Sequence, residues 1–138
     1  MVQLTRIYTK GGDKGKTSLG SGKRVSKASL RMAAIGDVDE ANAAMGVARL
    51  YAADDIDRLL FHIQNDLFDI GADLCVPEEG DTKERLRVDA HQVIFLEEKI
   101  DHYNATLPSL QSFVLPGGTS LSATLHLTRT IVRRAERT

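Results

Sequence analysis

The sequence predicts an all-α helical bundle in a single domain of 138 residues. Four segments carry apolar residues at steps of three and four, the spacing of a helix with one buried face. The period-two alternation typical of a strand occurs only from Leu4 to Tyr8. Hydrophobic residues make up 42% of the chain, which suits a soluble core, and no apolar run approaches the roughly 20 residues that span a bilayer.

The first predicted helix runs from residue 28 to about 53, is rich in alanine and contains no proline. Its apolar stripe comprises Ile35, Val38, Ala41, Met45 and Ala48. Carboxylates are dense inside it, in the run of residues 36–40. We interpret Asp37 and Glu40 as surface charges. Asp39 is either a solvated aspartate or the partner of an arginine.

The second predicted helix has the clearest pattern, and Asp54 or Asp55 can cap its start. Its stripe comprises Ile56, Leu59, Leu60, Ile63, Leu67, Ile70 and Leu74. Cys75 ends this stripe, so we predict a buried structural thiol. Because it is the only cysteine, an intramolecular disulfide is excluded. Residues 77–85 then form a predicted polar loop.

The third predicted helix begins at a capping box made by Asp89 and Gln92 and ends near Leu107–Pro108. After it, an apolar triplet starting at Phe113 leads into a Pro-Gly-Gly turn. The fourth predicted helix begins at Thr119 or Ser120, and its stripe comprises Leu121, Leu125, Thr128, Val132 and Ala135. No helix-stop signal precedes Thr138, so we expect a last helix to be missing after this residue.

Four arginines gather in residues 129–137 of the fourth predicted helix. Arg129 and Arg133 are four residues apart and therefore share a face. The guanidinium fork suits phosphate oxygens, and each charge-assisted hydrogen bond contributes roughly 1.5–3 kcal/mol. The pattern indicates an anion site. The alternative is a solvated basic helix end, which the helix dipole also favours.

A second basic element lies at the other end of the chain, where residues 5–27 hold five glycines among lysines, arginines and hydroxyls. Glycines let backbone N–H groups approach a polyphosphate closely. A Walker-type loop is excluded because only three residues separate Gly11 from Gly15 and no buried strand precedes them. The two basic elements can close on one anion.

The overall charge limits the kinds of partner. The net charge is −1 and the isoelectric point about 6.4, which argues against a dedicated nucleic-acid binder. The four histidines lack zinc-ligand spacing, so we assign no metal-ligating residue. The N-terminal residues resemble neither a secretion signal nor a transit peptide, so we expect a cytoplasmic protein without membrane partners.

Four motifs occur in order at residues 5–15, 36–40, 113–118 and 129–137. Together they resemble the ATP:cob(I)alamin adenosyltransferases of the propanediol-utilisation type. The resemblance implies a homotrimer of five-helix bundles with ferritin-like up-down packing, with ATP and corrinoid bound between subunits. Its members transfer the 5′-deoxyadenosyl group of ATP to cobalt, with Mg²⁺, and release triphosphate. A cobalt reductase and an adenosylcobalamin-dependent client enzyme are the implied partners.

The resemblance also implies site residues within a domain spanning 1–138, with 1–27 as its nucleotide-binding segment. The phosphates should be surrounded by Thr9, Lys10, Gly11, Gly12, Thr17, Ser18 and Lys27. The nucleotide site should be completed by Arg133, Arg134, Ala135, Glu136 and Arg137. Arg129 should pair with Asp39 of the next subunit, and Phe113 should face the corrinoid. These last three residues and Arg133 are the implied catalytic set. An Asn-Arg-Leu-Ser-Asp-type motif of the family's last helix does not occur in residues 1–138.

Two other functions stay open at this point. A nucleotide- or corrinoid-binding carrier would keep the phosphate loop without releasing triphosphate. A structural bundle would have basic ends that bind nothing. For Phe113, the alternative role is that of a core aromatic residue before a turn.

Overall fold

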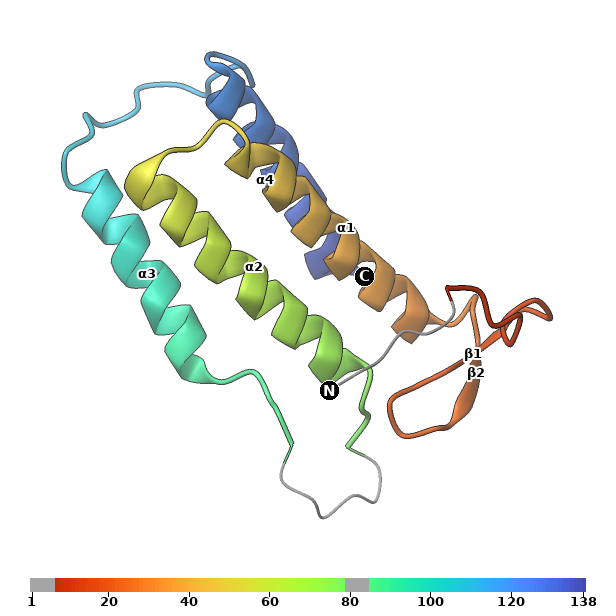
Figure 1. The fold of residues 1–138 in the computed structure, drawn as a ribbon. Coiled ribbons are helices and arrows are strands. Elements are labelled where there is room, and N and C mark those ends of the chain that lie inside the picture. The colour runs from red at the N-terminus through yellow and green to blue at the C-terminus, as the bar shows by residue number, and fades with distance from the viewer. Residues whose placement is uncertain (1–6, 79–84) are drawn as a thin grey trace.

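The computed structural model describes residues 7–78 and 85–138. A short hairpin of β1 (Lys16–Ser18) and β2 (Arg24–Ser26) precedes four helices. The helices are α1 (Leu30–Arg49), α2 (Asp54–Leu74), α3 (Ala90–Asn104) and α4 (Ser120–Arg137). Figure 1 shows the helices as a bundle and the hairpin beside the start of α1. The all-α prediction is confirmed.

Helix α1 packs antiparallel against both α2 and α4. Asn42 and Gln64 exchange hydrogen bonds between α1 and α2, each side-chain amide donating to the other residue's backbone carbonyl at 3.1 and 3.0 Å. On the other side, the buried hydroxyl of Thr128 donates to the carbonyl of Ala44 at 3.2 Å. The core lies between these helices around Met45, Ala48 and Leu60.

Helix α3 lies beyond α2, away from α1 (Figure 1). The Gln92 amide donates to the Asp66 carboxylate on α2 at 3.0 Å. None of the residues of α3 is buried, although Val93 and Ile100 belong to its predicted apolar stripe. The four helices run alternately up and down the bundle (Figure 1). Helix α3 packs less tightly against the bundle than the other three helices.

The structure corrects four details of the sequence prediction. Helix α1 ends at Arg49, about one turn before the predicted end near residue 53. Ala53 is the N-cap of α2, and Asp54 and Asp55 lie in the first turn without a capping hydrogen bond. Carboxylates in a first turn still favour the helix dipole. Helix α3 ends at Asn104, one turn before the predicted end. Cys75 is only partly buried.

Two predicted helix starts are confirmed. Asp89 and Gln92 form the capping box at the start of α3, where Asp89 accepts from the His91 N–H and donates its own N–H to Gln92. The Thr119 hydroxyl accepts the Ser122 N–H at 3.2 Å and caps α4.

The hairpin was not predicted. Thr17 in β1 pairs with Val25 in β2 in an antiparallel register. Strands of three residues are too short to show a period-two pattern. Of the predicted strand pattern, Leu4–Arg6 lie outside the described residues, and Ile7 and Tyr8 are in no strand. Residues 79–84 of the predicted polar loop also lie outside them.

The C-terminal end of α2 anchors the hairpin. The Gly20 N–H donates to the Cys75 carbonyl at 2.8 Å, and the neighbouring Leu19 is buried. A Cβ atom on Gly20 would lie 2.8 Å from Cγ2 of Val76, so only glycine fits without displacement. Arg31 of α1 donates to the Leu74 carbonyl at 2.7 Å. Carbonyls that the helix end leaves without partners are thereby satisfied.

Asp73 ties the segment before α3 to the same end of α2. Its carboxylate accepts the Val88 N–H at 3.1 Å and also pairs with Arg87. The hydrogen bond from Val88, followed by that from Arg87, lowers the pKa of Asp73 below its ordinary value.

This shift predicts a pH-dependent loss of stability. A lowered folded-state pKa contributes stability that is complete above the unfolded pKa of about 3.9 and is lost as pH falls through the folded pKa. We expect Asp73→Asn to lower the free energy of unfolding at neutral pH, and this deficit to shrink below about pH 4. Urea unfolding of the wild type and of Asp73→Asn, from neutral pH to below about pH 4, measures this deficit. A deficit that does not change with pH would contradict the role of the carboxylate charge.

Among the described residues, no helix has the length and hydropathy needed to cross a membrane.

Candidate functional site

The glycine-rich segment before β1 is held by an arginine from β2. Nη2 of Arg24 donates to the Gly11 carbonyl at 2.7 Å and to the Lys16 carbonyl at 3.1 Å. Nη1 of the same side chain donates to the Ser18 hydroxyl at 3.2 Å. Sequence analysis missed Arg24. Its only signal was a cation within the basic stretch that follows Gly20 and Gly22.

Lys27 and Gly12, both predicted site residues, lie side by side. A Cβ atom on Gly12 would lie 2.7 Å from Nζ of Lys27, so the lysine occupies the space that a side chain would need. The Lys27 N–H donates to the Gly15 carbonyl at 2.9 Å. Gly15 has a φ of 72°, in the left-handed region that favours glycine. The end of β2 therefore brings an ammonium group onto the glycine-rich segment.

The other predicted residues of this segment flank that pair. Lys10 is exposed, adopts a φ of 59° and places Nζ 6.0 Å from the centre of the Tyr8 ring. Thr9 and Gly11 are exposed, and Thr17 is half-buried in β1. The segment thus presents hydroxyls, lysines and glycine backbone on one small hairpin.

On α4, Arg134 is bound by two carboxylates of α1. It pairs with Glu40, and its Nε lies 3.6 Å from Oδ1 of Asp37. The hydrogen bond to Glu40 and the charge of this carboxylate raise the pKa of Arg134 above its ordinary value, with a smaller contribution from Asp37. Asp37 and Glu40, interpreted from the sequence as surface charges, therefore attach the end of α4 to α1. Thr138 adds a hydroxyl hydrogen bond to Asp37.

The other predicted site residues near the end of α4 are not bound by carboxylates in this way. Arg133, Glu136 and Arg137 are exposed and make no ion pair with a described residue, whereas Ala135 is half-buried. Helix α4 runs toward the end of the bundle that carries the hairpin and ends against Asp37, about two turns short of the start of α1 (Figure 1).

Arg129 and Asp39 do not meet within the chain. Asp39 lines an apolar cavity of about 360 Å³ between α1 and α2, together with Asn42 and Phe68. Arg129 lines a different hollow on α4, beside His126. A pair between these two residues would have to join two chains.

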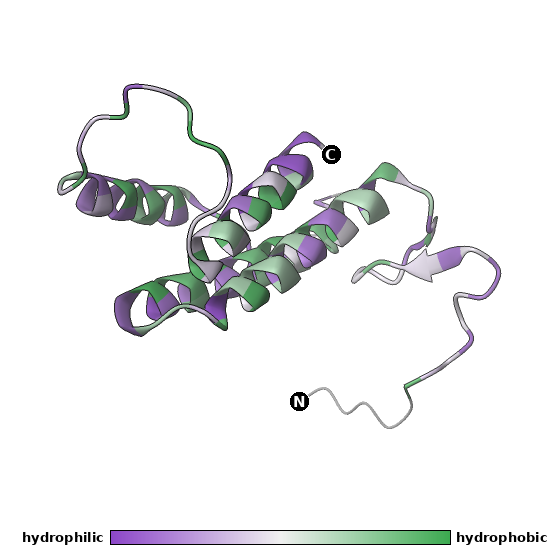
Figure 2. Ribbon diagram, turned by 90° about the horizontal axis from the view of Figure 1, so that it is seen from above, coloured by the Kyte–Doolittle hydropathy of each residue, from purple (hydrophilic) through white to green (hydrophobic). Residues whose placement is uncertain are grey.

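Phe113 is completely exposed, with a relative accessibility of 105%. It lies in the connection between α3 and α4, where Leu110 and Leu115 are also exposed. Figure 2 shows this connection as a long arch with a hydrophobic stretch. The alternative role of a core aromatic residue is therefore wrong, because the chain buries nothing against this ring.

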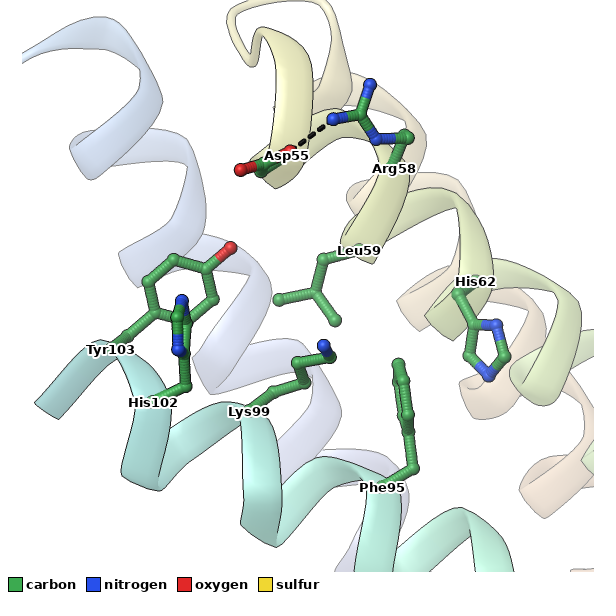
Figure 3. Close-up of a pocket in the computed structure, with 8 residues that line it drawn as sticks. All are labelled: Asp55, Arg58, Leu59, His62, Phe95, Lys99, His102 and Tyr103. Carbon is green, nitrogen blue, oxygen red and sulfur yellow. Dashed lines mark hydrogen bonds and ion pairs between the residues drawn. The ribbon is translucent and has the colours of Figure 1, made fainter.

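A second cavity of about 360 Å³ lies between α2 and α3 and contains no predicted site residue (Figure 3). Its charged groups are satisfied nearby. Arg58 pairs with Asp55, His62 lies 3.5 Å from an Asp66 oxygen, and Nζ of Lys99 lies 5.4 Å from the centre of a phenylalanine ring. The described residues contain no group of three or more His, Cys, Asp or Glu side chains placed to hold a metal ion.

Comparison with known proteins identifies the family. A model of the family described as cobalamin adenosyltransferase matches residues 7–138. The chain belongs to this family. A corrinoid adenosyltransferase of Mycobacterium tuberculosis is 52% identical over 139 residues, which cover 99% of this chain and 72% of the relative.

Solved structures identify the branch of the family. A PduO-type ATP:corrinoid adenosyltransferase from Lactobacillus reuteri, a phenylalanine-to-alanine variant complexed with cobalamin and ATP, superposes with a TM-score of 0.89. It is 40% identical, and the match covers 96% of this chain and 75% of that one. An arginine-to-lysine variant complexed with ATP gives a TM-score of 0.86 at 41% identity, with the same coverage. The resemblance drawn from four motifs is thus confirmed, as is the fold class.

Proposed function

We propose that this adenosyltransferase moves the 5′-deoxyadenosyl group of ATP to the cobalt of cob(I)alamin. The C5′–O bond of ATP breaks, its electron pair leaves with triphosphate, and the electron pair of Co(I) forms the Co–C bond. The observation that carries the proposal is a lysine-bearing glycine hairpin beside the start of α1, toward which the arginine-rich end of α4 runs, in a bundle of this family. Because Co(I) is itself the nucleophile, the protein needs only to align the reactants and stabilise the leaving group.

The hairpin is the proposed triphosphate subsite. Lys27 beside Gly12 supports this, since an ammonium next to open backbone can contact phosphate oxygens at close range. Thr9, Lys10, Gly11, Thr17 and Ser18 supply the rest of the subsite. These hydroxyl oxygens also suit Mg²⁺, which would accompany ATP and take most of its ligands from phosphates and water.

The end of α4 is the proposed second half of the nucleotide site. Arg133 and Arg137 are exposed and can turn toward phosphates. Arg134 is held by Glu40 and Asp37, so it fixes the direction of the end of α4. The two residues that follow it in the sequence, Ala135 and Glu136, would border the nucleotide.

The full site is proposed to form between subunits of a homotrimer. Arg129 would pair with Asp39 of the neighbouring subunit. The separation of these two residues into different cavities of one chain supports a pair between chains. Such a pair would place the arginines of one subunit against the α1 helix of the next.

Phe113 is the proposed corrinoid contact. Phe113, Val114 and Leu115 form a continuous run of exposed apolar side chains, and a contiguous apolar patch on the surface marks a site that another molecule covers. Against the lower face of the corrin, Phe113 would exclude a water or base ligand and favour four-coordinate cobalt, which is reduced more readily. The cytoplasmic partners would then be a reductase that supplies Co(I) and a client enzyme that uses adenosylcobalamin.

An anaerobic assay tests the function. The protein is mixed with chemically reduced cob(I)alamin and Mg-ATP while Co(I) absorbance and triphosphate are measured. We expect loss of the Co(I) spectrum, light-sensitive adenosylcobalamin and an equal amount of triphosphate. ATP binding without transfer would indicate either a carrier or a need for the family's last helix, and a longer chain that includes this helix would decide between the two. Absence of ATP binding would indicate a structural bundle.

A further inference from the structure

We infer that Arg24 is a positioning residue, which shapes the glycine-rich segment so that it can receive the triphosphate. The inference rests on the proposed nucleotide site and adds a residue to which sequence analysis gave no role. Arg24 acts through protein groups, since its hydrogen-bond acceptors are two backbone carbonyls and one hydroxyl.

The contacts of Arg24 join the glycine-rich segment before β1 to the two strands of the hairpin. Ser18 stands opposite Arg24 in the strand register, and Lys16 lies two residues earlier in β1. Gly11 lies outside the strands, 13 residues before Arg24. The same Nη2 atom donates to the Gly11 and Lys16 carbonyls, so it fixes the glycine-rich segment against the strand that follows it.

The segment has little else to order it. The backbone hydrogen bonds of residues 10–15 outside helices and strands are Asp13 N–H to the Lys10 carbonyl at 3.4 Å, Gly15 N–H to the Gly12 carbonyl at 3.1 Å and, at the end of the segment, Lys27 N–H to the Gly15 carbonyl at 2.9 Å. Three of these residues are glycines, which lose the most backbone freedom on ordering. A side chain that binds the segment therefore reduces the entropy that nucleotide binding must otherwise remove.

The backbone of β2, which carries Arg24, is itself held in place. The turn between β1 and β2 is anchored through Gly20 to the Cys75 carbonyl at the end of α2. Strand β2 therefore has a set position on the bundle, and two cations with different tasks lie at its two ends, Arg24 as its first residue and Lys27 directly after it. The guanidinium of Arg24 binds carbonyls that shape the segment, and the ammonium of Lys27 lies beside Gly12, where a phosphate would arrive.

The first measurement is amide hydrogen exchange of the nucleotide-free protein. In Arg24→Ala, we expect the two hydrogen-bonded amides of this segment, those of Asp13 and Gly15, to exchange about tenfold faster, the factor for a loss of about 1.4 kcal/mol. Exchange in α1, α2 and α4 should stay unchanged. The control is Arg58→Ala, which removes an exposed arginine of α2 whose ion pair among the described residues is with Asp55, and it should leave residues 10–15 unaffected.

The second measurement compares how tightly the protein binds the triphosphate and the adenosine of ATP. In Arg24→Ala, we expect the KM for ATP and the inhibition constant of inorganic triphosphate to rise together by about tenfold. The inhibition constant of adenosine and kcat should change by less than about twofold. Arg24→Lys should behave like the alanine variant, because one ammonium lacks the guanidinium fork that reaches carbonyls and hydroxyl at once.

Each outcome decides the inference. Unchanged exchange of residues 10–15, or equal losses for triphosphate and adenosine, would overturn it. Recovery of triphosphate affinity in Arg24→Lys would overturn it in favour of direct contact with phosphate. If the wild-type protein transfers no adenosyl group, the proposed function fails, and the exchange data alone decide whether Arg24 orders the segment.

Discussion

Arg133→Ala should reduce the rate of adenosyl transfer by about 10²–10³-fold, the usual effect of removing one group that stabilises developing charge. The leaving triphosphate gains negative charge as the C5′–O bond breaks, and a guanidinium stabilises it with paired N–H donors. Arg133 is exposed and forms no ion pair with a described residue, so its charge is available for that task.

Two further variants make this prediction specific. Arg133→Lys keeps the charge but loses the planar fork, so it should retain an intermediate rate. Arg58→Ala removes an exposed arginine near the start of α2, the end of this helix opposite the one that anchors the hairpin, and should transfer at the wild-type rate. Since Arg133 contributes no ion pair to the described fold, circular dichroism should show an unchanged helix content in Arg133→Ala. A near-normal rate in this variant would refute the role of the arginine series.

The helices could be predicted because each one repeats its signal over several turns. Residues of the predicted stripes, such as Met45 and Leu60, do form the core, and the capping box at Asp89 gives a boundary. The hairpin escaped prediction because its strands of three residues repeat nothing. A tertiary fold was needed to order them, through the contact between Gly20 and the end of α2.

The site could be predicted only in part, and for a different reason. Periodicity shows which face of a helix is apolar, but it does not show which distant charges meet. The pairing of Arg134 with Asp37 and Glu40 depends on the antiparallel packing of α4 on α1, which no local pattern contains. Arg24 was missed because its partners are carbonyls and a hydroxyl that become neighbours only after β1 and β2 pair.

Phe113→Ala should slow formation of adenosylcobalamin by about ten- to a hundredfold while leaving ATP affinity within about twofold of wild type. The ring is fully exposed, so its removal creates no cavity and should not change the free energy of unfolding. Its proposed task is to keep a water or base off the lower face of cobalt. The loss of rate should therefore be largest in a reaction that must first form four-coordinate cobalt.

The starting oxidation state of the corrinoid tests that task directly. From cob(II)alamin with a reductant, Phe113→Ala should show the full loss. From cob(I)alamin reduced beforehand, the loss should be much smaller, because the step that the ring assists has already taken place. Leu110→Ala, another exposed apolar residue of the same connection, is the matched control and should behave like wild type in both assays. Equal losses from both starting states would mean that Phe113 aligns the corrinoid with C5′, and a large loss of ATP affinity would move this residue to the nucleotide site.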